Sequence, residues 1–176
     1  MKKKMSAILI MLMLMLSSVL PAPDVHAQST FKDVNDKHGA VKEIQFLTGK
    51  KVIQGYQDGT FKPNNNLTRM QIALMLTRAR DYDLTNRPDP KLKDIKKEHE
   101  KFDVVSAVIE EGIFKDVVKK DEFKPNAFVT RSEMATIMAR AYKLTGVSSV
   151  QFTDVTTKHW AYGSVQAVAK NQIVKG

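Results

Sequence analysis

The sequence contains no cysteine and a single tryptophan among its 176 residues. Without cysteine there can be no disulfide staples, so the fold must depend on a packed apolar core. The usual catalytic patterns are missing as well: we find no G-x-S-x-G, no H-E-x-x-H and no glycine-rich phosphate loop. These absences lead us to expect a protein that is not an enzyme and that needs no cofactor.

The chain has only one long apolar run, and it lies close to the N-terminus. Three lysines precede the apolar stretch 6–20, and Val25-His26-Ala27 has the small-residue pattern of a signal peptidase site. The stretch is shorter than the roughly 18 residues that a membrane-spanning helix usually needs. We therefore predict that residues 1–27 are a cleaved signal peptide, and we expect no integral membrane segment after cleavage.

The secreted chain that remains is expected to be basic. Removing residues 1–27 takes three lysines and Asp24 from 28 basic and 19 acidic residues, which leaves 25 and 18 and a formal charge of +7. A basic protein outside the cell membrane favours an anionic partner. Nucleic acid is not expected, because no basic segment is interleaved with aromatic residues as a base-stacking groove would require.

A repeat organises the rest of the chain. Its clearest part is the pair FKPNNNLTRMQ at 61–71 and FKPNAFVTRSE at 123–133. Each unit begins with an apolar residue, Lys or Thr, Asp and an aliphatic residue, and these aspartates are 61 and 60 residues apart; they are Asp33, Asp94 and Asp154. The units are expected at 28–87, 88–147 and 148–176, as two full repeats and a truncated third.

The spacing of apolar residues within each unit predicts two helices joined by a loop. Eleven and fourteen residues after each aspartate stand Ile44 and Leu47 in the first unit, with aliphatic residues at the matching positions of the others, as on one helix face. A second apolar stripe follows Thr68 and Thr130. The loop at 55–66 is dense in turn-forming residues. We therefore predict an all-α fold of helix-loop-helix repeats that pack on one another.

Both second helices open with a capping box, Thr68 with Gln71 and Thr130 with Glu133. Capping does not explain the arginines at the first helical position, Arg69 and Arg131, because a cation there opposes the helix dipole. Two explanations remain open. Each arginine could form a salt bridge with a repeat aspartate (Asp33, Asp94 or Asp154), or could hold a ligand carboxylate or phosphate together with the helix N-terminus.

A histidine follows each repeat aspartate by five residues, at positions 38, 99 and 159. Three histidines in phase raise the alternative of a zinc site, because imidazole is a good zinc ligand. Histidines at helix starts are more often structural and form hydrogen bonds. We favour that explanation and predict no metal.

These motifs resemble the S-layer homology repeats of bacterial surface proteins, whose unit reads F-x-D-V, H-W-A, G-Y-x-D-G-T-F-x-P and T-R-A-E. Unit one carries Phe31-Lys-Asp-Val34, Gly55-Tyr56, Asp58-Gly-Thr-Phe61 and Thr68-Arg69. Unit two carries Asp94, Phe123, Pro125 and Thr130-Arg-Ser-Glu133. Unit three carries Phe152-Thr-Asp-Val155 and His159-Trp-Ala161 before the sequence ends at Gly176.

The resemblance implies an incomplete pseudo-threefold helical bundle that anchors a secreted chain to the cell wall or S-layer. Such bundles bind a secondary cell-wall polysaccharide, often pyruvylated, in grooves between repeats. The implied polysaccharide-binding residues are Arg69, Arg131, Trp160, Asp33, Asp94, Asp154, Gly55 and Tyr56.

The sequence departs from this family pattern at two aromatic positions and in one loop. Gly39 and Glu100 stand where units one and two should have Trp, and Asp116-Val117 replace Gly-Tyr in unit two. These departures favour an alternative function, a truncated remnant of a larger surface protein with only protein–protein contacts. We also expect self-association through the third repeat, and lower stability than a complete triplet would have.

Overall fold

The computed structural model describes residues 31–174, in which the chain forms five α-helices and no strand. The β-type pairings among these residues are two isolated bridges, Thr68–Phe128 and Lys119–Glu122. The all-α prediction is confirmed, and the signal peptide predicted at 1–27 lies outside the described residues. The helices are α2 (Val41–Gly49), α3 (Arg69–Ala79), α4 (Phe102–Glu110), α5 (Arg131–Ala141) and α6 (Tyr162–Lys170).

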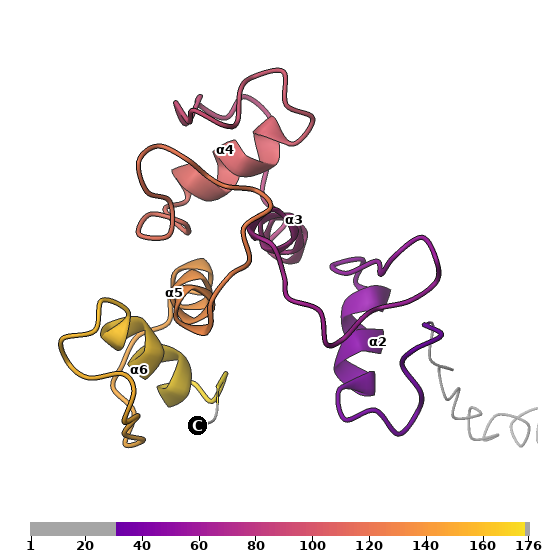
Figure 1. Ribbon diagram of the computed structural model, residues 1–176, viewed down its shortest axis with the longest axis vertical. Coiled ribbons are helices and arrows are strands. Elements are labelled where there is room, and N and C mark those ends of the chain that lie inside the picture. Colours follow the sequence, from indigo (N-terminus) through magenta and orange to yellow (C-terminus); the bar gives the residue numbers. More distant parts are fainter. Residues whose placement is uncertain (1–30, 175–176) are drawn as a thin grey trace, which may run out of the picture.

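Three lobes surround two central helices (Figure 1). α3 and α5 are seen nearly end-on at the centre, while α2, α4 and α6 each lie in an outer lobe with their flanking loops. α4 packs on α3 and α6 packs on α5. Each central helix therefore supports the first helix of the following unit, so that neighbouring units interlock.

The outer helices α2, α4 and α6 have no side-chain cap on their N-cap residues. A histidine imidazole one turn earlier accepts a hydrogen bond from the N-cap backbone instead. The three bonds are Ala40 N to His38 Nδ1 (3.2 Å), Lys101 N to His99 Nδ1 (3.0 Å) and Ala161 N to His159 Nδ1 (3.1 Å). An accepting Nδ1 carries no proton, so each imidazole has its proton on Nε2 or none to spare. The predicted structural role of these histidines is confirmed.

The central helices α3 and α5 both begin with the predicted capping box. Thr68 Oγ1 accepts from Gln71 N at 3.2 Å, and Gln71 Oε1 accepts from Thr68 N at 2.9 Å. Thr130 and Glu133 repeat this exchange at 3.2 and 2.9 Å. Such a cap typically contributes about 1 kcal/mol to helix stability, and it fixes where the arginine of each helix is placed.

Each lobe has its own apolar cluster, and the central helices link the clusters. Ile72, Ala73 and Leu76 of α3 lie in one cluster with α4 and with Ile137 of α5. The opposite side of α5 packs against α6. The first lobe has a smaller cluster under α2, and from α3 only the partly buried Met75 packs against it.

The three lobes bury matching residues to different extents. Val108 and Val168 are fully buried, as the apolar spacing predicts, whereas their counterpart Leu47 on α2 is only partly buried. Phe46 beside it is 64% exposed. The first lobe therefore leaves apolar surface uncovered that the other two lobes cover with a central helix.

Candidate functional site

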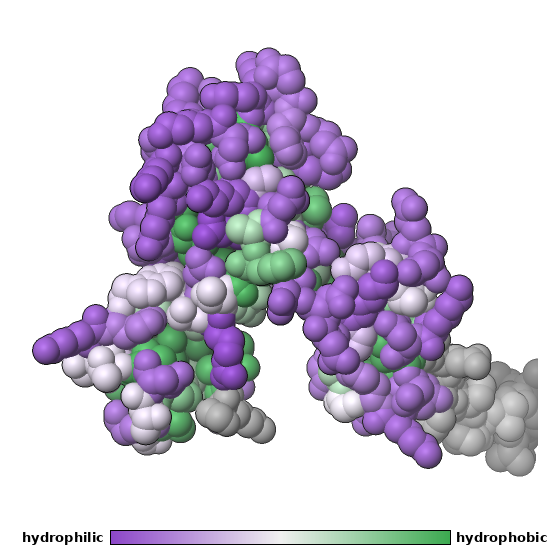
Figure 2. Space-filling view, in the orientation of Figure 1, coloured by the Kyte–Doolittle hydropathy of each residue, from purple (hydrophilic) through white to green (hydrophobic). Residues whose placement is uncertain are grey.

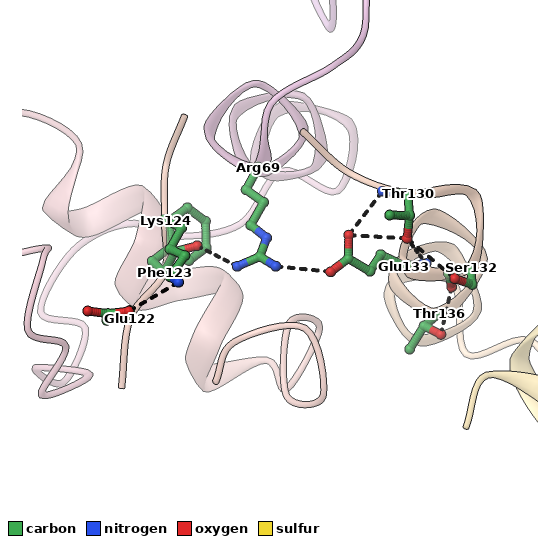
Figure 3. A network of polar contacts seen from close by, with 8 residues as sticks. All are labelled: Arg69, Glu122, Phe123, Lys124, Thr130, Ser132, Glu133 and Thr136. Carbon is green, nitrogen blue, oxygen red and sulfur yellow. Dashed lines mark hydrogen bonds and ion pairs between the residues drawn. The ribbon is translucent and has the colours of Figure 1, made fainter. Parts of the chain in front are cut away.

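Arg69 lies almost buried between two repeats, with 11% of its side chain exposed. Its Nη2 donates to Glu133 Oε1 at 2.9 Å, and its Nη1 donates to the Phe123 carbonyl at 3.0 Å (Figure 3). Glu133 is 17% exposed and uses its other oxygen for the capping box. Arg69 thus ties the start of α3 to both the loop and the central helix of unit two.

The partner of Arg69 corrects one of the two explanations offered by the sequence. An internal salt bridge is present, but its acid is Glu133 and not a repeat aspartate. The sequence assigned Glu133 to capping, and capping occupies only one of its two carboxylate oxygens. A signal was available: the third helical position holds a neutral residue in α3, Gln71, and an acid in α5.

The first turn of α3 is also covered by backbone of the next unit. Its N–H groups donate from Arg69 N to Ala127 O at 2.9 Å and from Met70 N to Pro125 O at 3.0 Å. The first N–H groups of a helix are its natural anion-binding groups. At α3 the loop carbonyls already occupy them.

Arg131 stands at the equivalent position of α5, but its surroundings differ. It is exposed, and within residues 31–174 its guanidinium has no ion pair or hydrogen bond. An uncommitted guanidinium beside a helix N-terminus can bind a carboxylate through two parallel hydrogen bonds. Of the two predicted arginines, Arg131 alone is free for a ligand within the described part of the chain.

The repeat aspartates hold the loops of their own units. Asp33 accepts from Phe61 N and Lys62 N, both at 2.7 Å. Asp94 accepts from Phe123 N at 2.9 Å and from Lys124 N at 2.6 Å. The two lysines have positive φ values of 58° and 55°, a strained backbone for a residue with a side chain. The carboxylates therefore stabilise a strained turn that leads into each central helix.

The hydrogen bond from the Phe61 N–H, supported by the one from Lys62, lowers the pKa of Asp33. In the same loop, bonds from the Thr60 hydroxyl and N–H lower the pKa of Asp58 to about 2. A carboxyl whose pKa is lower in the folded state stabilises the fold above its unfolded pKa of about 3.9. That stabilisation is lost as the pH falls through the folded pKa.

We accordingly expect the melting temperature to fall steeply between pH 4 and pH 2, and circular dichroism at 222 nm will follow it. An Asp58→Asn variant should melt lower at pH 7 and depend less on pH in this range. Asp36→Asn is the matched control, an exposed aspartate of the same lobe, and should behave like the unmodified chain. Identical pH profiles for all three proteins would contradict the assignment.

The remaining predicted residues lie in two different places. Trp160 is 51% exposed and directly precedes α6, and its ring lies 5.9 Å from that of His159. The next residue, Ala161, shares a cluster with Ala135 of α5, one helical turn after Arg131. The start of α6 therefore packs on the helix that Arg131 begins. Asp154 is also exposed in this lobe.

Gly55 and Tyr56 lie in the first lobe, apart from Arg131 and Trp160 by sequence unit and by cluster. Gly55 has φ of 68°, and a Cβ there would lie 2.2 Å from the Phe31 ring, so only glycine fits. Tyr56 is at the surface with the Lys62 ammonium 4.3 Å from its ring centroid. Sequence reasoning did not anticipate this cation–π contact, nor the apolar groove that both residues border.

No group of three or more metal-binding side chains occurs among residues 31–174. Within the same range, no helix is both long and apolar enough to span a membrane. The described chain thus offers one exposed, uncommitted arginine in a scaffold whose other conserved-looking polar residues hold loops and caps in place.

Fold and site together define an all-α repeat protein in which each unit's second helix supports the next unit. A family profile described as the S-layer homology domain matches residues 30–73, 91–135 and 151–176. The chain therefore belongs to the S-layer homology domain family, as its motifs predicted. It is a secreted, cell-wall-associated chain with a role in anchoring at the cell surface.

Several relatives are surface proteins of bacteria. The Surface-layer 125 kDa protein of Lysinibacillus sphaericus is 34% identical over 93% of this chain and 14% of its own length. The Cellulosome-anchoring protein of Acetivibrio thermocellus is 28% identical over 77% and 31%, and the S-layer protein sap of Bacillus anthracis is 28% identical over 79% and 17%. The chain thus spans less than a third of the length of each of these relatives.

Proposed function

We propose that this chain is a non-catalytic module that binds an anionic, pyruvylated cell-wall polysaccharide non-covalently. The observation that carries this proposal is the exposed Arg131, uncommitted within residues 31–174, at the start of α5. A pyruvate ketal presents a carboxylate, which a guanidinium binds with two donors and which a helix N-terminus favours. The formal charge of +7 expected for the mature chain supports attraction to an acidic polymer.

The sugar-stacking part of the site is assigned to Trp160. Its exposed ring precedes a helix that packs on α5, so ring and arginine belong to one pair of interlocked helices. Gly55 and Tyr56 would form a second contact area in the first lobe. In this proposal Asp33 and Asp94 act indirectly, because their oxygens are occupied by loop N–H groups.

Arg69 is assigned a structural role, since its donors are used within the fold. This observation also favours the second candidate function, a surface protein with protein–protein contacts and little sugar binding. The unit boundaries 28–87, 88–147 and 148–176, with a signal peptide at 1–27, remain part of the proposal.

Co-sedimentation with purified bacterial cell walls separates the two functions. We expect the chain to sediment with intact walls and to remain in solution once the polysaccharide has been stripped. Arg131→Gln should lower the bound fraction about tenfold, equivalent to about 1.4 kcal/mol, while keeping its melting temperature. Lys143→Gln, an exposed charge just after the same helix, is the matched control. Equal sedimentation with stripped walls would favour the protein–protein alternative.

A further inference from the structure

An apolar groove runs between α2 and α3 on the first lobe. It has a volume of about 450 Å³ and is lined by Ile44, Leu47, Val52, Leu74 and Met75 among others. In the space-filling view the first lobe and the α6 lobe stand apart, while both join the α4 lobe (Figure 2). The groove is thus on the side of the first lobe where no central helix lies among residues 31–174.

The internal repeat shows what covers the same surface elsewhere. Leu47 and Met75 correspond to Val108 and Ile137, which are fully buried in one cluster with Ile72, Ala73 and Leu76 of α3. In the third lobe Val168 is buried together with Ala135 and Ala139 of α5. In both lobes the cover is the small, apolar face of a central helix from the preceding unit.

We propose that this groove is a docking site for a helix of the α3 and α5 type presented by another polypeptide. Its partner would be an amphipathic helix of about three turns with an alanine-rich face. Ala73 and Ala135 both occupy the fifth helical position, where a small residue lets the central helix approach its outer helix. The same position of the docked helix should be small.

Charge specifies the start of the docked helix. Arg69, first in α3, pairs with Glu133, third in α5. Arg131, first in α5, has the matching geometry and no acid within the described residues. A docked helix with Glu at its third position would therefore extend the series to Arg131.

A second copy of this chain is a poorer occupant. Its own α3 and α5 are packed on α4 and α6 through buried residues, including Ala73 and Ala135. Offering either helix to a neighbour would expose that surface at a cost of about 25 cal/mol for each Å². A chain whose helix is not already engaged binds without this cost.

The test uses a synthetic peptide of residues 123–142, the loop and helix of unit two, added to the full chain. We expect saturable binding by calorimetry, with a gain of helical circular dichroism. Peptide Ala135→Glu should bind at least tenfold more weakly, because a long charged side chain blocks the close approach. Peptide Glu133→Gln should bind roughly tenfold more weakly, but not to an Arg131→Gln chain, where the two peptides should bind alike.

The variants of the chain locate the site. Leu47→Gln in the groove should weaken binding tenfold, whereas Val147→Gln, exposed in the third lobe, should not. Leu47→Gln leaves Arg131 in place, so this test stands or falls independently of polysaccharide binding. No peptide binding, or equal binding of the Ala135→Glu peptide, would overturn the proposal. So would dimerisation of the chain alone, seen by sedimentation velocity and removed by Leu47→Gln.

Discussion

Phe123→Ala is expected to lower the free energy of unfolding by about 3–5 kcal/mol, the usual loss for truncating a fully buried phenylalanine. The Phe123 side chain is 0% exposed, and its ring centroid lies 5.1 Å from that of Phe114. Its backbone N–H is held by Asp94 and its carbonyl by Arg69. The backbone is thus fixed from two sides and cannot easily relax into the cavity.

Phe61→Ala is the matched control, because Phe61 occupies the same place in the first unit. Its ring contacts Phe31 at 5.4 Å but borders the groove and is only partly buried. We expect a loss of about 1–2 kcal/mol there, since less apolar area leaves water on folding. Urea unfolding followed by circular dichroism will compare the two midpoints. Equal losses would contradict the unequal packing of the two lobes.

The repeat and its helices could be predicted because they depend on local sequence. Thr68 and Thr130 act on N–H groups three residues away, so both capping boxes are visible in the sequence. Apolar spacing likewise identifies the buried face of each helix. These are contacts that close within one or two helical turns.

The partners of those helix faces could not be predicted in the same way. Apolar spacing shows that α3 has a buried face, but not that α4 of the next unit covers it. Glu133 was assigned to capping alone, because a carboxylate with two oxygens can satisfy a local and a distant donor together. The groove beside Leu47 was missed for a related reason: its spacing matches that of Val108, and only the missing neighbour makes it different.

Arg69→Ala and Arg131→Ala should separate stability from binding, although the two arginines occupy equivalent positions. Arg69→Ala removes a mostly buried cation and leaves Glu133 without its partner, so we expect a loss of about 3 kcal/mol. Arg131→Ala removes an exposed side chain and should change stability by less than about 0.5 kcal/mol. Denaturant unfolding of both variants will measure the difference.

Glu133→Gln isolates the ionic part of this interaction. Glutamine serves the capping box of α3, so the variant keeps the cap of α5 while removing the negative charge. We expect a loss of about 1–2 kcal/mol. The double variant Arg69→Ala/Glu133→Gln should lose about 1 kcal/mol less than the sum of the single variants, because the two residues share one interaction. Strict additivity would mean that the pair contributes nothing as a pair.

Wall binding then gives the functional half of the comparison. At a temperature where both variants are folded, Arg69→Ala should still sediment with walls that carry the polysaccharide, because its donors face the interior. Arg131→Ala should not, although it is the more stable of the two. The reverse result, with binding lost only in Arg69→Ala, would require Arg69 to leave Glu133 for the ligand, and would move the anion site from α5 to α3. Stability and binding therefore have to be measured on the same two proteins, since either alone would leave the roles of the two arginines interchangeable.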